Sequence, residues 1–314
     1  MLKKLKIQNL RARPIWYFIM GWALILSTPF LLIPLFLLAQ EEPSQSLWDY
    51  HPIHVGGNVL RIGEAHVDSP QEGNLLFHKN NLFLTMLLPI SAKSFFFPRV
   101  EWNELTLDWN KNPKFKETHF YYLQFGLMFY TSAVENWRWI LRTDYNIDLH
   151  HFSHPGTYGL FSGLIWGTNK INERWNYHVG STFYIGMHGT VVYPLIGCDY
   201  SPDEHWQFRA IFPIDYAIQY KVDKHWTMAL KGRPLKERFR AGNHDPQPRS
   251  IFNYSSIGAE ANIQYEIEGR FVLEIYGGYN FGGKLYIKNQ HGHNALYTTF
   301  EGAPYGGGKI DYAF

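Results

Sequence analysis

The chain has 314 residues, of which 18% are aromatic and 18% are charged, and its mean hydropathy is −0.27. These values argue against a helical membrane protein, which needs several apolar runs of about 20 residues, and the single cysteine, Cys198, excludes an internal disulfide framework. The formal net charge is +2, but five basic residues precede residue 40, and without them 24 basic residues face 27 acidic ones, a net charge of −3. The body therefore lacks the basic footprint of a nucleic-acid-binding protein, and we expect no nucleic-acid partner.

Residues 1–39 have the pattern of an export signal. Residues 1–13 are basic, residues 15–38 are apolar, and a polar, acidic stretch follows Ala39. A basic region, an apolar region and a polar start to the mature chain are typical of secretory signals. We therefore expect cleavage near Ala39, which leaves residues 40–314 as the mature protein.

The alternative for this segment is an uncleaved inner-membrane anchor. Leu37 occupies a position where signal peptidase prefers a small residue, and the apolar region is longer than the usual length of about 7–15 residues. Pro29 and Pro34 would interrupt an anchoring helix, although transmembrane helices tolerate proline.

The mature chain shows no helical period and repeatedly shows an alternation of period two. In residues 137–149 one face is apolar and aromatic, with Trp137, Trp139, Leu141, Tyr145, Ile147 and Leu149. The opposite face is polar, with Arg138, Arg142, Asp144, Asn146 and Asp148. The same alternation recurs in residues 206–212, 214–222 and 261–267. Because successive side chains of a strand point to opposite sides, each segment predicts a strand with one apolar and one polar face.

Short polar turns recur, each followed closely by an aromatic residue. They are Glu135-Asn136-Trp137, Asn172-Glu173-Arg174-Trp175, Asp203-Glu204-His205-Trp206, Asp223-Lys224-His225-Trp226 and Glu268-Gly269-Arg270-Phe271. Aromatic side chains favour the boundary between membrane and water, and barrels carry a girdle of them at each rim. We expect one girdle to contain Trp137, Trp139, Trp175, Trp206, Trp226 and Phe271.

The other connections are mostly longer, at residues 64–74, 110–117, 150–155, 233–251 and 283–302, although those at Gly189 and Pro213 are tight. Short turns on one side and longer loops on the other match outer-membrane barrels, in which the short turns are periplasmic.

These signals predict an all-β protein, an antiparallel up-and-down transmembrane β-barrel of 12–14 strands with both termini periplasmic. The fourteen provisional strands are residues 52–63, 75–89, 100–109, 118–131, 137–149, 156–169, 174–187, 190–201, 204–213, 214–222, 224–233, 252–267, 270–282 and 303–314. A different division of residues 190–233 gives twelve.

The last strand carries Ile310, Tyr312 and Phe314 on one face. This ending resembles that of bacterial outer-membrane β-barrel proteins, whose last strand typically ends in Phe with an aromatic or apolar residue two positions earlier. The resemblance implies that these three residues form an assembly signal, recognised by the barrel-assembly machinery. With the export signal of residues 1–39, we expect export through the inner membrane and a final location in the lipid of a Gram-negative outer membrane.

A second resemblance covers about residues 190–230. Tyr193-Pro194-Leu195-Ile196-Gly197 leads into Tyr200-Ser201-Pro202-Asp203 and Trp206, followed by Phe212-Pro213, Tyr220 and Trp226. This segment is similar to a family of predicted outer-membrane barrels of unknown function. The family supplies no activity and no catalytic residues.

Histidines gather in two predicted outer loops, and they raise the possibility of a metal-capturing mouth. They are His150, His151 and His154 in one loop, and His291 and His293 in the other. Imidazoles are good ligands for Zn²⁺ and Cu²⁺, but neither loop has a ligand set of fixed spacing and no cysteine is nearby. We favour exposed loop histidines, with no metal and no cofactor.

Barrel hydrolases require a serine, a histidine and an acid within hydrogen-bonding reach of one another. Ser153 and His154 are adjacent in the sequence, but no motif of a barrel lipase is present. We expect no enzymatic activity.

The polar faces of the strands predict the lining of the lumen, with charges of both signs: Arg138, Arg142, Asp144, Asp148, Arg209, Lys221, Glu266 and Glu274. These charges either line a narrow water-filled pore or pair across a closed lumen. The first hypothesis is a narrow passive channel for small solutes with weak ion selectivity, because neither sign dominates. The alternatives are a non-conducting structural or surface-interaction barrel that acts through its loops, and a soluble β protein tethered by residues 15–38. The oligomeric state stays open.

Overall fold

The structure is a computed structural model that describes residues 51–68, 72–110, 116–187, 189–242, 244–267, 270–293 and 296–314. The predicted export signal, residues 1–39, lies outside these ranges. The described residues from 51 to 89 and from 93 to 314 belong to one compact unit. Within the described ranges, no helix is long and apolar enough to cross a membrane.

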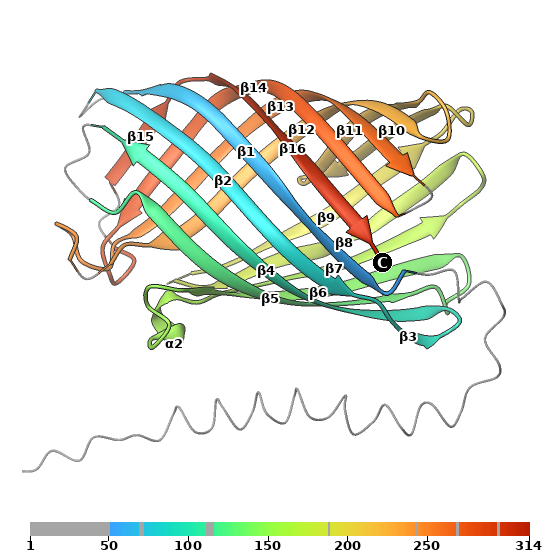
Figure 1. The fold of residues 1–314 in the computed structure, drawn as a ribbon, viewed down its shortest axis with the longest axis horizontal. Helices are drawn as coiled ribbons and strands as arrows, with labels where there is room; N and C mark the ends of the chain where they lie inside the picture. Colours follow the sequence, from blue (N-terminus) through green and yellow to red (C-terminus); the bar gives the residue numbers. More distant parts are fainter. Residues whose placement is uncertain are drawn as a thin grey trace, which may run out of the picture. The chain divides into compact units, whose positions relative to one another are not determined.

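Fourteen antiparallel strands close into a barrel (Figure 1). They are β1 (Ile53–Val67), β2 (Gly73–Met86), β4 (Ser94–Trp109), β5 (His119–Thr131), β6 (Trp137–Asp148), β7 (Leu160–Lys170), β8 (Trp175–Gly186), β9 (Thr190–Tyr200), β10 (Trp206–Phe212), β11 (Asp215–Lys221), β12 (Trp226–Arg240), β13 (Ile251–Ile267), β14 (Phe271–Lys288) and β16 (Ala303–Ala313). Each strand pairs with the next, and β1 pairs with β16 from His54↔Ala313 to Ile62↔Tyr305, which closes the ring.

Three short elements accompany the ring: β3 (Leu88–Ser91), α2 (Pro155–Tyr158) and β15 (Leu296–Phe300). β15 pairs with β14, and its Phe300 pairs with Val67 of β1, so β15 extends the last strand position beyond β16. The rim that holds the short turns, Ile53 and Ala313 is termed the terminal end, and the opposite rim, with α2, is termed the loop end. Residues 190–233 contain β9, β10, β11 and the first part of β12, so the division of this segment that gives fourteen strands is confirmed.

The short turns are closed by one recurring hydrogen-bond arrangement. The Oδ1 atom of Asp203 accepts hydrogen bonds from the backbone N–H groups of His205 and Trp206, both at 2.8 Å. Asp223 accepts in the same way from His225 and Trp226, at 2.7 and 2.8 Å. Asn172 does so in a third turn. A side-chain oxygen that binds its own backbone two residues later stabilises a tight turn, which explains the residue type at these positions.

Five strands begin at the aromatic residues that the turn pattern singled out, which are Trp137, Trp175, Trp206, Trp226 and Phe271. The predicted lengths of the longer loops were wrong at several places. Residues 233–240 continue β12, residues 283–288 continue β14, and residues 64–67 continue β1. Some charged residues of these segments, such as Glu64, Lys236 and Lys284, are exposed and resemble loop residues when read alone. The apolar residues between them, such as Val67, Phe239 and Leu285, are buried by tertiary contacts at the loop end.

Prolines within strands mark the edges of a gap in the hydrogen-bonded ladder. Pro194 of β9 pairs with β8, whereas the pairing of β9 with β10 starts only at Ile196. Pro234 of β12 pairs with β13, whereas the pairing of β12 with β11 ends at Gly232. Proline has no N–H group and therefore fits a strand edge without a partner. The short β10–β11 hairpin thus leaves β9 and β12 with unpaired edges towards the loop end.

The turn carboxylates predict a specific response to acid. Backbone N–H groups of Trp206 and His205 hold the pKa of Asp203 below its usual range, and those of His225 and Trp226 do the same for Asp223. A lowered pKa in the folded state stabilises the fold above the unfolded pKa, about 3.9, and this stabilisation is lost as the pH falls through the folded pKa.

We expect the variant Asp203→Asn with Asp223→Asn to lose less stability between neutral pH and pH values below about 4 than the unmodified protein. Asparagine keeps the accepting Oδ1 atom but has no proton to gain. Urea unfolding in detergent micelles at several pH values measures the effect, and the exposed neighbour Glu204→Gln is the control. Identical pH profiles for the double variant and the unmodified protein would contradict this account.

Candidate functional site

Large apolar side chains cover the outside of the barrel. Leu230 and Ile275 are 60% and 61% exposed, and both lie on strands whose opposite faces are polar. The same belt includes Val59, Leu82, Leu84, Val100, Phe125, Leu141, Ile165, Val192, Ile196, Ile218 and Ile263. So extended an apolar surface is not stable in water and matches the lipid-facing band of a transmembrane barrel.

The predicted girdle residues lie at the terminal end of this belt. Trp175, Trp206 and Trp226 are exposed, and the rings of Trp137 and Trp139 stack with their centroids 5.2 Å apart. The face of the last strand that carries Ile310, Tyr312 and Phe314 is also exposed. Their contact with lipid and with the assembly machinery stays a prediction.

Ion pairs between neighbouring side chains line the terminal half of the lumen. Arg142 binds Asp144 through two hydrogen bonds, at 2.8 and 3.1 Å. Arg209 bridges Asp199 and Asp215, at 2.9 and 3.3 Å. Glu274 forms a further ion pair, with Lys231 at 3.0 Å. These ion pairs contain four of the predicted lining residues, which are Arg142, Asp144, Arg209 and Glu274.

The other four predicted lining residues have different surroundings. Arg138 and Lys221 are exposed near the terminal rim. Glu266 is half-buried, and its carboxylate lies 3.4 Å from the side-chain amide of Gln264. Asp148 is buried and accepts hydrogen bonds from the backbone N–H groups of His150 and His151, so it anchors the loop that leads to α2.

Sequence reasoning missed a buried ion pair of the lumen. The guanidinium of Arg233 donates to both carboxylate oxygens of Glu260, at 2.5 and 2.8 Å, and the hydroxyl of Tyr305 donates to the same carboxylate at 3.1 Å. Arg233 also lies over the ring of Tyr276, 4.3 Å from its centroid. Glu260 alternates with Asn262 and Gln264 along β13, so the period-two pattern contained a signal for its lumen-facing position.

The loop-end half of the lumen is filled by apolar side chains. Phe77 of β2 stacks on Tyr254 of β13, and Phe120 of β5 contacts Phe239 of β12, each pair with ring centroids 4.5 Å apart. Phe252 joins the second pair, at 6.3 Å from Phe120 and 5.5 Å from Phe239. These five residues, each at most 2% exposed, are termed the aromatic plug.

The plug joins strands that are not neighbours in the ring. Fourteen strands about 4.8 Å apart and tilted by about 40° would enclose a circular barrel roughly 28 Å across. Two aromatic rings in direct contact hold their strands only about 15 Å apart. A further contact across the lumen is the ion pair of Lys79 with Glu237, at 2.6 Å. The two walls are therefore drawn together at the loop end, and the plug fills the space between them there.

The loop histidines have local partners. His151 stacks on Tyr158 with ring centroids 4.0 Å apart and binds Asp148 at 3.2 Å, and His150 lies 3.4 Å from Glu117. No group of three His, Cys, Asp or Glu side chains in the described ranges is placed to hold a metal ion.

Ser153 and His154 are hydrogen-bonded, with 2.9 Å between Oγ and Nδ1. No carboxylate of the described residues is hydrogen-bonded to His154. The acid that orients the histidine of a hydrolase triad is thus not supplied by this part of the chain.

Residues 105–310 match the family described as Domain of unknown function (DUF6268). The chain belongs to this family. The match contains the segment of residues 190–230 and confirms its similarity to barrels of unknown function.

Two uncharacterized chlamydial proteins are relatives. One, from Chlamydia pneumoniae, is 27% identical over 198 residues, which are 62% of this chain and 62% of the relative, so less than two thirds of the relative is spanned. The other, from Chlamydia trachomatis, is 20% identical over 271 residues, which are 81% of this chain and 85% of the relative.

Two solved structures are similar in fold. The COG4313 outer membrane channel from Pseudomonas putida F1 is 9% identical, with a TM-score of 0.47 over 88% of this chain and 100% of that chain. The P. putida toluene transporter TodX is 10% identical, with a TM-score of 0.43 over 85% and 90% of the two chains. At such identities and scores the similarity carries no information on cargo.

The buried ion pair predicts a large effect of a single substitution. Arg233→Met leaves the carboxylate of Glu260, whose side chain is 1% exposed, without its cation. Removal of one partner of a buried pair typically costs about 3–5 kcal/mol, so we expect a loss of about 3 kcal/mol in the free energy of unfolding. Urea unfolding in micelles measures it.

Lys309→Met is the matched control, because Lys309 is 40% exposed and its pair with Asp311 is 3.9 Å long. We expect this control to lose less than about 1 kcal/mol. Equal losses for the two variants would show that burial does not set the strength of the Arg233–Glu260 pair.

Proposed function

We propose that the protein is an outer-membrane channel for small solutes that rests in a closed state. The observation that carries the proposal is the division of one lumen into a charged terminal half and an apolar loop-end half. A lining of ion pairs is wettable, and the aromatic plug, within a larger buried apolar cluster, separates it from the loop end. Apolar constrictions of this kind act as gates because they exclude water, and small displacements of their side chains readmit it.

The apolar belt and the C-terminal face of Ile310, Tyr312 and Phe314 support the location that the proposal requires. A barrel with this belt requires lipid or detergent around it. We propose that the chain is exported through the inner membrane with residues 1–39 as its signal. We also propose that the barrel-assembly machinery recognises the C-terminal face and inserts the barrel into the outer membrane.

A second candidate is a non-conducting barrel that acts through its loops. The observation that favours it is the packing of the plug, since Phe252 and Phe77 are 0% and 1% exposed. Interiors packed so closely resist rearrangement. Under this second function the plug would be a permanent core and the loops at the same end would be the active surface.

Single-channel recording in planar bilayers separates the two functions. We expect the unmodified protein to show brief, discrete openings, because the plug closes the resting state. We expect Phe120→Ala with Phe239→Ala to spend much more time open, because the substitutions remove two facing rings of the plug. Phe125→Ala is the matched control, since Phe125 lies on β5, as Phe120 does, but on its exposed, lipid-facing side.

An unmodified protein that inserts and resists heat unfolding but carries no current would contradict the channel proposal and favour the second candidate. A Phe125→Ala variant that opens as often as the double variant would show that the plug is not the gate.

The paired charges predict weak ion selectivity. In the Phe120→Ala, Phe239→Ala background we expect a reversal potential near zero in a gradient of potassium chloride, because most paired lumen carboxylates have a cation of their own and Asp199 and Asp215 share Arg209. Addition of Glu274→Gln leaves Lys231 without the carboxylate at 3.0 Å and shifts the preference towards chloride. The exposed Glu204→Gln is the control, and an unchanged reversal potential in the Glu274 variant would remove Glu274 from the ion path.

A further inference from the structure

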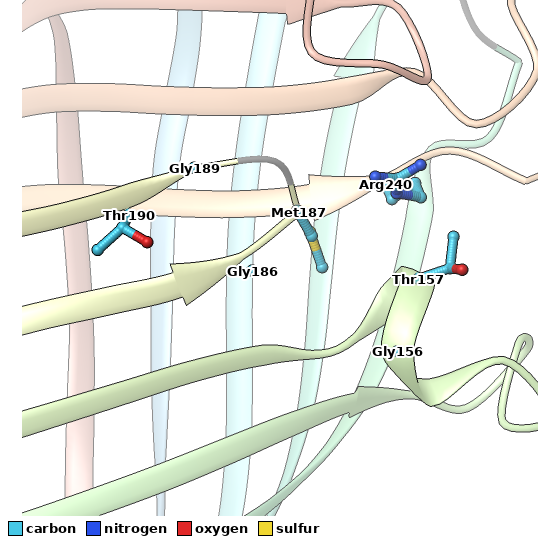
Figure 2. A pocket seen from close by; sticks show the side chains of 7 residues that line it. All are labelled: Gly156, Thr157, Gly186, Met187, Gly189, Thr190 and Arg240. Carbon is cyan, nitrogen blue, oxygen red and sulfur yellow. The ribbon is translucent and has the colours of Figure 1, made fainter. Parts of the chain in front are cut away.

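A cavity of about 330 Å³ lies at the loop end between α2, the connection from β8 to β9 and the end of β12 (Figure 2). Its lining residues are Gly156, Thr157, Gly186, Met187, Gly189, Thr190 and Arg240. Arg240 lies one residue beyond Phe239 and thus on the opposite face of β12 from the aromatic plug. Met187 of its lining also belongs to the buried apolar cluster that contains the aromatic plug, so the cavity borders that cluster. Its volume is at the lower end of the range of small-molecule pockets, about 300–1,000 Å³.

Arg240 is the charged group of this cavity, and it is only 2% exposed. Its Nη1 atom donates to the backbone carbonyls of Arg249 and Gln290, both at the long distance of 3.4 Å. Its Nε atom has no hydrogen-bond partner among the described residues. The guanidinium also lies over the ring of Tyr158, 5.7 Å from its centroid. A buried cation is costly unless a negative group and hydrogen bonds compensate it, and among the described residues no carboxylate does so for Arg240.

Arg240 differs in this respect from the cations that line the lumen. Lumen cations such as Arg142, Arg209 and Arg233 are in ion pairs with carboxylates. In the described ranges, no ion pair links a carboxylate to Arg238 or Arg240 on the other face of β12.

Arg238 bridges the gap in the ladder, through hydrogen bonds to the carbonyls of Gly186 and Gly189 at 3.1 and 3.3 Å. Lys236 lies over the ring of Tyr193, 4.1 Å from its centroid. The end of β12 therefore presents several cations on one face, next to a cavity that contains no acidic lining residue.

We propose that this cavity binds a small oxyanion, a carboxylate or phosphate group, with the Arg240 guanidinium as its principal ligand. The Nε–H group supplies a charge-assisted hydrogen bond, which is about twice as strong as a neutral one. The hydroxyls of Thr157 and Thr190 supply two further donors at the cavity wall. The inference goes beyond the proposed function, because binding here requires no conduction through the lumen.

The same oxyanion chemistry has two possible sources, a free solute and the phosphate of a lipid headgroup. Titration of protein purified in a non-ionic detergent distinguishes them. Inorganic phosphate and acetate are the free probes, each compared with chloride at equal ionic strength, and phosphatidylglycerol added to the micelles is the headgroup probe. The readouts are the melting temperature and the heat of binding.

We expect at least one probe to raise the melting temperature of the unmodified protein. Arg240→Met should bind that probe roughly tenfold or more weakly, the loss expected for a charged hydrogen bond. Without a probe, Arg240→Met should be at least as stable as the unmodified protein, because it removes an uncompensated buried charge. Arg174→Gln, which removes an exposed cation at the terminal end, is the matched control and should respond like the unmodified protein.

Arg240→Lys provides a second variant that keeps the charge but loses the planar fork of donors, and we expect it to bind more weakly than arginine and more tightly than methionine. A response to phosphate or acetate assigns a free solute, and a response to phosphatidylglycerol alone assigns a headgroup. The proposal is overturned if no probe shifts the unmodified protein, or if both Arg240 variants respond as it does. A channel that fails to conduct but binds a probe through Arg240 would separate this site from the proposed function.

Discussion

In lipid, every backbone N–H and C=O group must find its partner within the protein, because the hydrocarbon offers none. The pairing of β1 with β16 meets this constraint by joining the first strand to the last, so the fourteen-strand ring has no end. Closure divides each strand into a lipid face and a lumen face. The apolar belt, the ion pairs and the aromatic plug all follow from that division.

The constraint is relaxed between β9 and β12, on the loop-end side of the short β10–β11 hairpin. Pro194 and Pro234 occupy the edges left there, where a missing N–H group costs nothing. The Arg238 guanidinium donates to the carbonyls of Gly186 and Gly189 and so replaces part of the absent ladder. The gap therefore brings the polar face of β12 and the turn between β8 and β9 together, and these two segments also line the cavity around Arg240.

The interior of the barrel is filled in two different ways in the two halves of the lumen. In the terminal half, charges of opposite sign lie within hydrogen-bonding distance, as Arg233 and Glu260 do, which offsets the cost of removing them from water. In the loop-end half, rings from opposite walls meet, and burial of apolar surface replaces hydration. Lys79 and Glu237 combine both solutions, since they form an ion pair across the lumen.

The sequence by itself determined the strand faces, the turn positions and the starts of strands at residues such as Trp175 and Trp206. These features depend on near neighbours along the chain, and a period of two reveals them. Only the tertiary structure decided that residues 233–240 are strand, that Phe120 meets Phe239 and that Arg240 has no carboxylate partner among the described residues. Alternation shows which face a side chain takes but not which distant strand lies opposite, and that choice depends on how the closed ring is drawn together.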